Sequence, residues 1–210
     1  MPKLTTNEVF AKLKVTDFSV FEKPGKNKGA RGQLLETALG VPNSSDLQDL
    51  EDGEIKTFTV GESIAATQLK HCLSEIIEDA VSFDDSKVGQ KLKQTLYVGF
   101  TRENDYVGCE ILNEETHPKH YQELREDYEF ICEQIRTAFE RGVELDQLGF
   151  VNRKGEPSHT ITGPNGLLQI RTKASKTKRN DYTPLTFTDV TFNNKGMAFY
   201  LCGSFGRNLF

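Results

Sequence analysis

An acidic stretch over residues 44–57 ends in an alternating segment that carries Glu54 and Lys56. Side chains two positions apart on a β-strand point to the same face, so these two groups should meet. Asp46, near the head of the stretch, would add a second carboxylate if it lies where this strand starts. Two neighbouring carboxylates suit Mg²⁺, which binds protein carboxylates together with water and phosphate oxygens. A lysine beside them can activate a water molecule and stabilise charge on a phosphate, so the pattern is typical of phosphodiester hydrolysis.

The same spacing also has an ordinary structural explanation. An exposed strand face can carry a simple Glu/Lys pair, and on spacing alone this explanation is the more frequent one. Three further acids, Asp49, Glu51 and Asp52, lie within the stretch. The choice of the second carboxylate therefore stays open at this point.

Hydrophobic periodicity and turn residues predict the elements that must position these groups. Polar residues that alternate with β-branched or aromatic ones indicate strands, and apolar residues at helical spacing indicate helices that end at glycine. The predicted strands cover 53–60, an antiparallel hairpin of 94–100 and 106–112, a hairpin turning at 164–166, and a strand within 197–205. The predicted helices lie within 7–21, over 32–39 up to Gly40, and over 119–141 up to Gly142. Together these elements predict a mixed α/β domain.

Composition limits the class of protein. The chain has 210 residues, 36% of them hydrophobic and 27% charged, which fits a globular domain of one or two lobes. No apolar run is long enough to span a membrane, and the N-terminus lacks the apolar core of a signal peptide, so we expect a cytoplasmic location and no membrane partner. The four scattered cysteines indicate reduced thiols rather than a zinc site.

Charge is unevenly distributed along the chain. The net charge is −5, but residues 171–179 hold five positive charges and no acid. Lys23, Lys26, Lys28 and Arg31 form a second basic group around glycines. Because a nucleic acid responds to the local field, these clusters are compatible with one positive DNA-binding face.

Six segments, in the same order, resemble the MutH/Sau3AI family of DNA endonucleases, whose catalytic core is a variant of the restriction-enzyme PD-(D/E)xK motif. They extend from about residue 28 to residue 208, nearly the whole chain. The segments are KGARGQLLETALG at 28–40, GEIKT at 53–57, KLKQTL at 91–96, YQELREDYE at 121–129, GLLQIRTKA at 166–174 and AFYLCGSF at 198–205.

The resemblance implies a restriction-endonuclease-like α/β fold. In such a fold a mixed β-sheet core is flanked by helices, and two lobes form a DNA-binding cleft. We expect a single MutH/Sau3AI-like domain over residues 1–210. Its catalytic lobe would include about 28–112, and its DNA-reading lobe about 150–208.

The resemblance also implies roles for individual residues of the active site. Asp46 and Glu54 would bind Mg²⁺, for which Mn²⁺ substitutes, and the Ile55 carbonyl would add a third oxygen. Lys56 would act on the nucleophilic water. The remaining members of the catalytic set would be Glu36, which supports the metal ligands or the water network, and Lys91, which completes the charge stabilisation.

One departure from the family pattern concerns the second carboxylate. The chain has one more residue between Asp46 and Glu54 than the bacterial repair enzyme has. A one-residue bulge would absorb it, or Asp49 would be the ligand instead. We favour Asp46 because it leads the segment, as in the family.

Double-stranded DNA is the implied substrate, with GATC as its recognition site. Arg171 and Lys173 match the family's pair that contacts bases and phosphates, and Tyr200 matches a tyrosine that senses the adenine. A solvated basic hairpin and a core tyrosine are the structural alternatives. The full expected DNA-binding set is Lys28, Gly29, Arg171, Lys173, Lys176, Lys178 and Tyr200.

These expectations favour a type II site-specific deoxyribonuclease, either complete or as the catalytic domain of a longer enzyme. A C-terminal regulatory domain or a second copy of the chain is a possible partner. The alternatives are a mismatch-repair nicking endonuclease activated by a partner protein and a catalytically inactive DNA-binding module. A generic α/β interaction protein is a further alternative, and it predicts no metal dependence.

Overall fold

A computed structural model of the chain describes residues 3–20, 30–42, 46–173, 182–187, 190–193 and 196–210. The chain divides into two compact units, each assembled from separate stretches of sequence. Unit 1 comprises Met1–Ile64, Lys91–Lys119 and Gly203–Phe210, and unit 2 comprises Ala65–Gln90 and His120–Cys202. Residues 65–90, which lie inside the range expected for the catalytic lobe, therefore belong to unit 2.

Unit 1 holds a three-stranded mixed sheet in the order β1-β3-β4. β1 (Glu54–Thr59) runs parallel to β3 (Gln94–Phe100), and β3 is antiparallel to β4 (Tyr106–Asn113). Parallel neighbours need a long connection, and here residues 60–93 supply it. The three strands, and the hairpin made by the last two, confirm the sequence prediction.

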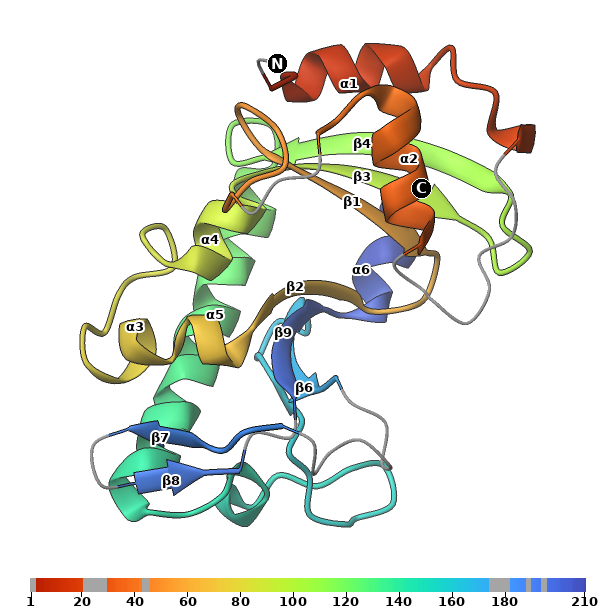
Figure 1. Cartoon of the computed structure of the whole chain (residues 1–210). Helices are drawn as coiled ribbons and strands as arrows, with labels where there is room; N and C mark the ends of the chain where they lie inside the picture. The colour runs from red at the N-terminus through yellow and green to blue at the C-terminus, as the bar shows by residue number, and fades with distance from the viewer. Residues whose placement is uncertain (1–2, 21–29, 43–45, 174–181, 188–189, 194–195) are drawn as a thin grey trace. The chain divides into compact units, whose positions relative to one another are not determined.

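Two helices lie against this sheet, and both contact its strands (Figure 1). α1 (Thr6–Leu13) starts with a capping box in which Thr5 and Glu8 satisfy each other's backbone amides. α2 (Ala30–Leu39) ends where Gly40 adopts a φ of 75°, as predicted. The Lys12 Nζ atom binds the Leu39 carbonyl at 2.7 Å, so α1 also caps the end of α2.

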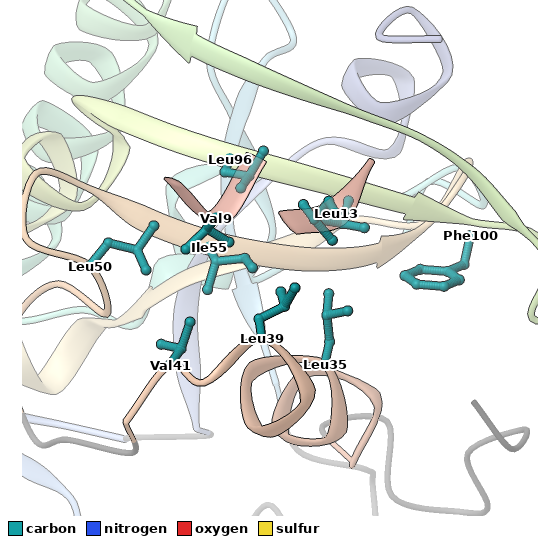
Figure 2. Close-up of a cluster of buried hydrophobic side chains, with 10 residues drawn as sticks. Val9, Leu13, Leu35, Leu39, Val41, Leu50, Ile55, Leu96 and Phe100 are labelled. Atoms are coloured by element: carbon teal, nitrogen blue, oxygen red, sulfur yellow. The ribbon is translucent and has the colours of Figure 1, made fainter. Parts of the chain in front are cut away.

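The core of unit 1 lies between these helices and the sheet (Figure 2). Figure 2 shows Leu35 and Leu39 of α2 pointing toward Ile55 of β1. The residues of this buried cluster are Val9, Leu13, Leu35, Leu39, Val41, Leu50, Ile55, Leu96, Val98 and Phe100. Since Ile55 points into this core, its strand neighbours Glu54 and Lys56 project from the other face of β1.

Unit 2 contains a four-stranded sheet in the order β2-β9-β6-β5 and a separate two-stranded pair. The hairpin of β5 and β6 confirms the predicted turn at 164–166, and the long helix α5 ends at Gly142, with φ 62°, as predicted. The strands are β2 (Ile64–Gln68), β5 (Ile161–Thr162), β6 (Leu168–Thr172), β7 (Leu185–Phe187), β8 (Val190–Phe192) and β9 (Met197–Leu201). The helices are α3 (Leu73–Ile77), α4 (Lys87–Leu92), which crosses the unit boundary, and α5 (Pro118–Arg141).

A buried carboxylate on α5 fastens the turn between β5 and β6. Asp127 is 0% exposed and accepts backbone N–H groups from Asn165 at 2.7 Å, Leu167 at 2.7 Å and Leu168 at 2.8 Å. The turn approaches so closely that a Cβ on Gly163 would lie 2.2 Å from the Asp127 Cγ atom. Asp127 therefore sets the position at which β6 begins.

The predicted strand within 197–205 was too long. β9 ends at Leu201, and the chain continues as a short helix, α6 (Gly203–Arg207). A Cβ on Gly203 would lie 2.5 Å from the Gly61 carbonyl oxygen, so the helix packs directly on backbone of unit 1. The apolar run does not reveal this change, because apolar residues suit a short helix as well as a strand.

None of the helices in the described part of the chain is long and apolar enough to span a membrane. The four cysteines are unpaired thiols, three of them buried and Cys109 partly exposed, as the sequence predicted.

Candidate active site

Glu54 stands at the first position of β1 and is 1% exposed, so its carboxylate is almost fully removed from water. A glycine must precede it, because a Cβ on Gly53 would lie 2.5 Å from the Gln94 carbonyl oxygen. A buried carboxylate needs hydrogen bonds or opposite charges around it. The groups that supply them define the candidate site.

Two lysines converge on one oxygen of Glu54. Lys56, from the same strand, contacts the Oε1 atom, and the Nζ atom of Lys91 lies 3.3 Å from the same oxygen. Both lysine side chains are 21% exposed, so each is mostly buried. Lys91 occupies the last turn of α4, just before β3 begins alongside β1. The structure thus brings together three of the residues that the sequence predicted as a catalytic set.

The turn before β1 brings Asp49 against Glu54. The Leu50 amide binds the Gly53 carbonyl at 2.9 Å, which closes a tight turn and reverses the chain. The Asp49 amide then donates to the Glu54 Oε2 atom at 3.1 Å. Burial raises the pKa of the Asp49 carboxyl, and the Glu54 charge raises it further, while Lys56 and Lys91 act in the opposite direction.

The turn itself is held by Asp52. Its Oδ1 atom accepts bonds of 2.6 Å from both the amide and the hydroxyl of Thr6, at the start of α1. Its Oδ2 atom accepts a bond of 2.9 Å from the Gln94 side chain on β3. Asp52 is thus a structural carboxylate, although the sequence alone offered it as one of several candidate ligands.

Glu36 completes the group from α2. Burial raises the pKa of its carboxyl, and the nearby charges of Asp49 and Glu54 raise it as well, whereas Lys56 lowers it. Its Oε1 atom also lies close to Gly32, one turn earlier on α2. Glu36 is therefore within electrostatic reach of the other site residues, as the sequence predicted.

Asp46 occupies a different environment from the one we expected. Its side chain is 62% exposed, and its carboxylate pairs with the Lys3 Nζ atom at 2.9 Å. Lys3 also donates to the Gln48 carbonyl at 2.5 Å. The tight turn that begins after Asp49 explains the difference. It brings Asp49, the residue directly before the turn, opposite Glu54, whereas Asp46 lies further back along the chain. The geometry favours Asp49 over Asp46 as the second carboxylate.

The aspartate–glycine pair before Glu54 is the signal that points to this arrangement. Asp-Gly is a strong turn signal, and a tight turn brings the residues on its two sides together. The choice of Asp46, which rested on its place at the head of the segment, as in the family, does not take that reversal into account.

A cluster of three or more potential metal ligands does not occur in the described part of the chain. No group of three His, Cys, Asp or Glu side chains there is close enough to hold one ion. The Ile55 side chain belongs to the core, and its backbone is in register with Leu96, so the ligand role of its carbonyl stays a prediction.

The predicted DNA-reading residues lie in unit 2, on the adjacent strands β6 and β9. The Arg171 guanidinium stacks 4.5 Å from the centre of the Tyr200 ring. Burial raises the pKa of Tyr200, and Arg171 partly counteracts that rise. Lys173 follows β6 with an exposed side chain, and its amide binds the Gly196 carbonyl at 2.7 Å.

Four other predicted DNA contacts lie outside the described residues, namely Lys28, Gly29, Lys176 and Lys178. Their roles remain predictions.

The chain matches no known protein-family model and no curated protein. The functional proposal therefore depends on the geometry of the site and on the resemblance of the six sequence segments.

Proposed function

We propose that this chain is a Mg²⁺-dependent, sequence-specific DNA endonuclease with a restriction-endonuclease-like core, a type II site-specific deoxyribonuclease acting at GATC. One observation carries the proposal. A nearly inaccessible Glu54 carboxylate binds two lysines through one oxygen, while two further carboxylates with raised pKa values stand around it.

The charge balance of this group distinguishes it from an ordinary buried ion pair. Glu36, Asp49 and Glu54 would carry three negative charges if all were ionised, against two positive charges on Lys56 and Lys91. The raised pKa values of Glu36 and Asp49 reflect that excess together with burial. A group of this kind favours the uptake of a proton or a cation. Carboxylate oxygens are the ligands that Mg²⁺ prefers, so the donor set fits this ion.

Asp49 and Glu54 would hold the metal, with Glu36 in support, and Mn²⁺ is expected to substitute for Mg²⁺. A bound dication would lower the pKa of a water molecule and offset charge on the phosphate. One or two protein carboxylates are enough for Mg²⁺, because water molecules and phosphate oxygens complete its coordination.

The two lysines suit different parts of phosphodiester hydrolysis. Lys56 is on the same strand as Glu54, so its ammonium group lies beside the expected metal ligands and can orient the attacking water. Lys91 approaches from α4 and can stabilise the charge that grows on the phosphate oxygens. Tyr97 is buried, which raises its pKa, and it lies close enough to Glu54 for the charge of that carboxylate to raise the pKa further.

Reading of the DNA sequence is proposed for the segment around Arg171 and Lys173. Arginine can bind guanine through two acceptors in the major groove, and lysine can bind phosphate. The stacking of Arg171 on Tyr200 supports this role, because it holds a flexible side chain in one orientation.

The test uses supercoiled plasmid with several GATC sites, either unmethylated or adenine-methylated. Wild-type protein is incubated with Mg²⁺ or with EDTA, alongside Lys56→Ala and the matched control Lys93→Ala. Lys93 is an exposed lysine close to Lys91, so its loss removes the same charge outside the Glu54 cluster. We expect discrete fragments that map to GATC, that disappear in EDTA and in Lys56→Ala, and that persist in Lys93→Ala.

The products separate the two enzyme classes. Linear plasmid supports a restriction enzyme, whereas open circles support a nicking endonuclease of the mismatch-repair type. A plasmid that stays supercoiled while a GATC duplex still shifts in a gel indicates an inactive binding module or a missing partner. A protein that neither cuts nor binds DNA at low salt overturns the proposal.

A further inference from the structure

Tyr182, in unit 2, is a residue to which the predicted site gives no role. It follows the basic segment in sequence and precedes β7, and its side chain is partly exposed. Its ring packs on Gly196, the Gly196 carbonyl is bonded to the Lys173 amide, and Tyr182 is close enough to Tyr200 to affect the pKa of that residue.

The Tyr182 ring packs against Gly196. An ideal Cβ on Gly196 would lie 2.8 Å from the Tyr182 Cζ atom and 2.9 Å from its Cε2 atom, so any larger residue would displace the ring. Gly196 also has a φ of 64°, a conformation that glycine adopts without strain. Aromatic rings commonly cover glycines in sheets in this way. The ring position is therefore determined by a residue directly before β9.

The same glycine is bonded to the reading segment. Its carbonyl accepts the Lys173 amide at 2.7 Å, just past the last paired residues of β6 and β9. The Tyr182 phenol is also close enough to Tyr200 to contribute to the raised pKa of that residue, although burial is the larger cause. Tyr182 thus stands beside the strand ends from which Arg171 and Lys173 project.

Two polar groups near Gly196 have no hydrogen-bond partner among the described residues. The Nε atom of Arg171 is buried and has no partner in the described part of the chain. The Tyr182 hydroxyl forms no hydrogen bond with the described residues, and the residue is not fully covered. A partly exposed tyrosine whose ring is held in one position can offer its hydroxyl to a ligand.

We infer that Tyr182 is a further DNA-contacting residue, whose hydroxyl, held in place by Gly196, binds the duplex next to Arg171 and Tyr200. The inference rests on the proposed DNA-binding function. A phenol hydroxyl can donate to a phosphate oxygen or to a base acceptor, and it can accept from an exocyclic amine. In either case Tyr182 forms one neutral hydrogen bond to nucleic acid, and the experiment below distinguishes a phosphate contact from a base contact.

The experiment measures duplex binding by fluorescence anisotropy at a fixed low salt concentration. All proteins carry Lys56→Ala, which allows Mg²⁺ to be present without cleavage. One duplex contains a single GATC site, and a second has the same composition with the site scrambled. Into this background we introduce Tyr182→Phe, Gly196→Ala and the control Tyr121→Phe, which removes the same hydroxyl from a buried tyrosine of α5.

We expect Tyr182→Phe to weaken binding of the GATC duplex about 2- to 10-fold, the effect of one neutral hydrogen bond. Gly196→Ala should weaken it at least as much, because the added Cβ displaces the ring. Tyr121→Phe should bind as the background protein does. A loss confined to the GATC duplex indicates a base contact, and an equal loss on both duplexes indicates a phosphate contact. Either result supports the inference.

Unchanged binding of both duplexes by Tyr182→Phe overturns the inference while leaving the proposed function intact. A background protein that binds neither duplex overturns both. Thermal melting of each variant separates a lost contact from a lost fold, since Tyr182→Phe keeps the ring on Gly196 and should melt at the same temperature as its parent.

Discussion

The two units each contain an almost completely buried carboxylate, and the partners of these two groups differ. Glu54 of unit 1 is 1% exposed and Asp127 of unit 2 is 0% exposed. Among the described residues, Glu54 binds two lysine side chains and one backbone amide. Asp127 binds three backbone amides of a single turn.

This difference separates a structural carboxylate from one suited to chemistry. Backbone amides cannot leave Asp127 unless the turn before β6 unfolds, so that group is locked for as long as the protein is folded. Lysine side chains can rotate away from Glu54 while the strand stays in place. Glu54 can therefore exchange partners, as a metal ligand or proton-handling group must, whereas Asp127 cannot. The comparison predicts that substitutions at Glu54's partners affect activity and that substitutions at Asp127 affect stability.

The largest effect is expected from Lys56→Ala on DNA cleavage. Loss of a group that acts on the attacking water should reduce the cleavage rate about 100- to 10,000-fold. Folding should change little, because Lys91 remains on the same Glu54 oxygen. Single-turnover cleavage of a GATC duplex and thermal melting measure the two properties. A variant that loses stability in proportion to activity would contradict an exchangeable role for this lysine.

Asp127→Ala tests the other side of the comparison. The substitution removes the acceptor of three backbone amides, one of them buried and two partly buried. A buried amide left without an acceptor costs about 1–3 kcal/mol and a partly buried one costs less, so we expect a loss of about 2 kcal/mol or more in the free energy of unfolding. Urea denaturation measures it. Glu126→Ala is the matched control, since this neighbouring carboxylate binds the side chains of Gln122 and Asn165 at the surface and should leave the urea midpoint unchanged.

If Asp127→Ala instead unfolds at the same urea concentration as wild type and fails only in cleavage, the two carboxylates are not distinguished by their partners. Unit 2 would then hold a second chemically active group, and the backbone amides would have to be satisfied in some other way.

Much of this arrangement was predictable from sequence, because local rules decide it. Gly40 and Gly142 end helices in the left-handed conformation that glycine favours, and both ends were predicted correctly. Glu54 and Lys56 meet because strand side chains alternate, a property that needs no tertiary information. The approach of Lys91 from α4 could not be derived in this way and came only from the resemblance to a family.

The sequence was least informative where a short turn or a tertiary contact decides the environment of a residue. A single turn before β1 exchanges the environments of Asp46 and Asp49, which differ little in sequence. The carboxylates of Asp52 and Asp127 look like any surface acids until their partners, far along the chain, are known. Tyr182 gives no signal at all, because its role depends on the missing side chain of Gly196.

A smaller effect is expected from pH on the stability of the metal-free protein. Burial raises the pKa of Glu36 above its ordinary 4.5 and that of Asp49 above its ordinary 3.8. The folded protein therefore holds these protons more tightly than the unfolded chain does. Their contribution to stability is complete below the ordinary pKa values and is lost as the pH rises through the raised ones.

Melting in EDTA from about pH 4 to about pH 7 measures this contribution. The double variant Glu36→Gln, Asp49→Asn should lack this loss and should melt a few degrees higher than wild type near neutral pH. Saturating Mg²⁺ should raise the melting temperature of wild type but not of the variant. If the melting temperatures of the two proteins instead change in parallel with pH, the pKa values of Glu36 and Asp49 are not raised in the folded protein.

The smallest effect is expected from Asp46→Asn, which tests whether Asp46 or Asp49 is the second carboxylate of the site in unit 1. The Asp46 carboxylate is 62% exposed and pairs with Lys3 at the surface, so its loss should change the free energy of unfolding by no more than about 0.5 kcal/mol. Cleavage should persist in Asp46→Asn and be lost in Asp49→Asn, because the tight turn places Asp49, with its amide on Glu54, beside the reacting groups. A quantitative cleavage assay over a range of Mg²⁺ concentrations decides between them. If Asp46→Asn instead requires much more Mg²⁺ than Asp49→Asn, the turn must open when the metal binds, and Asp46 would then be the second ligand.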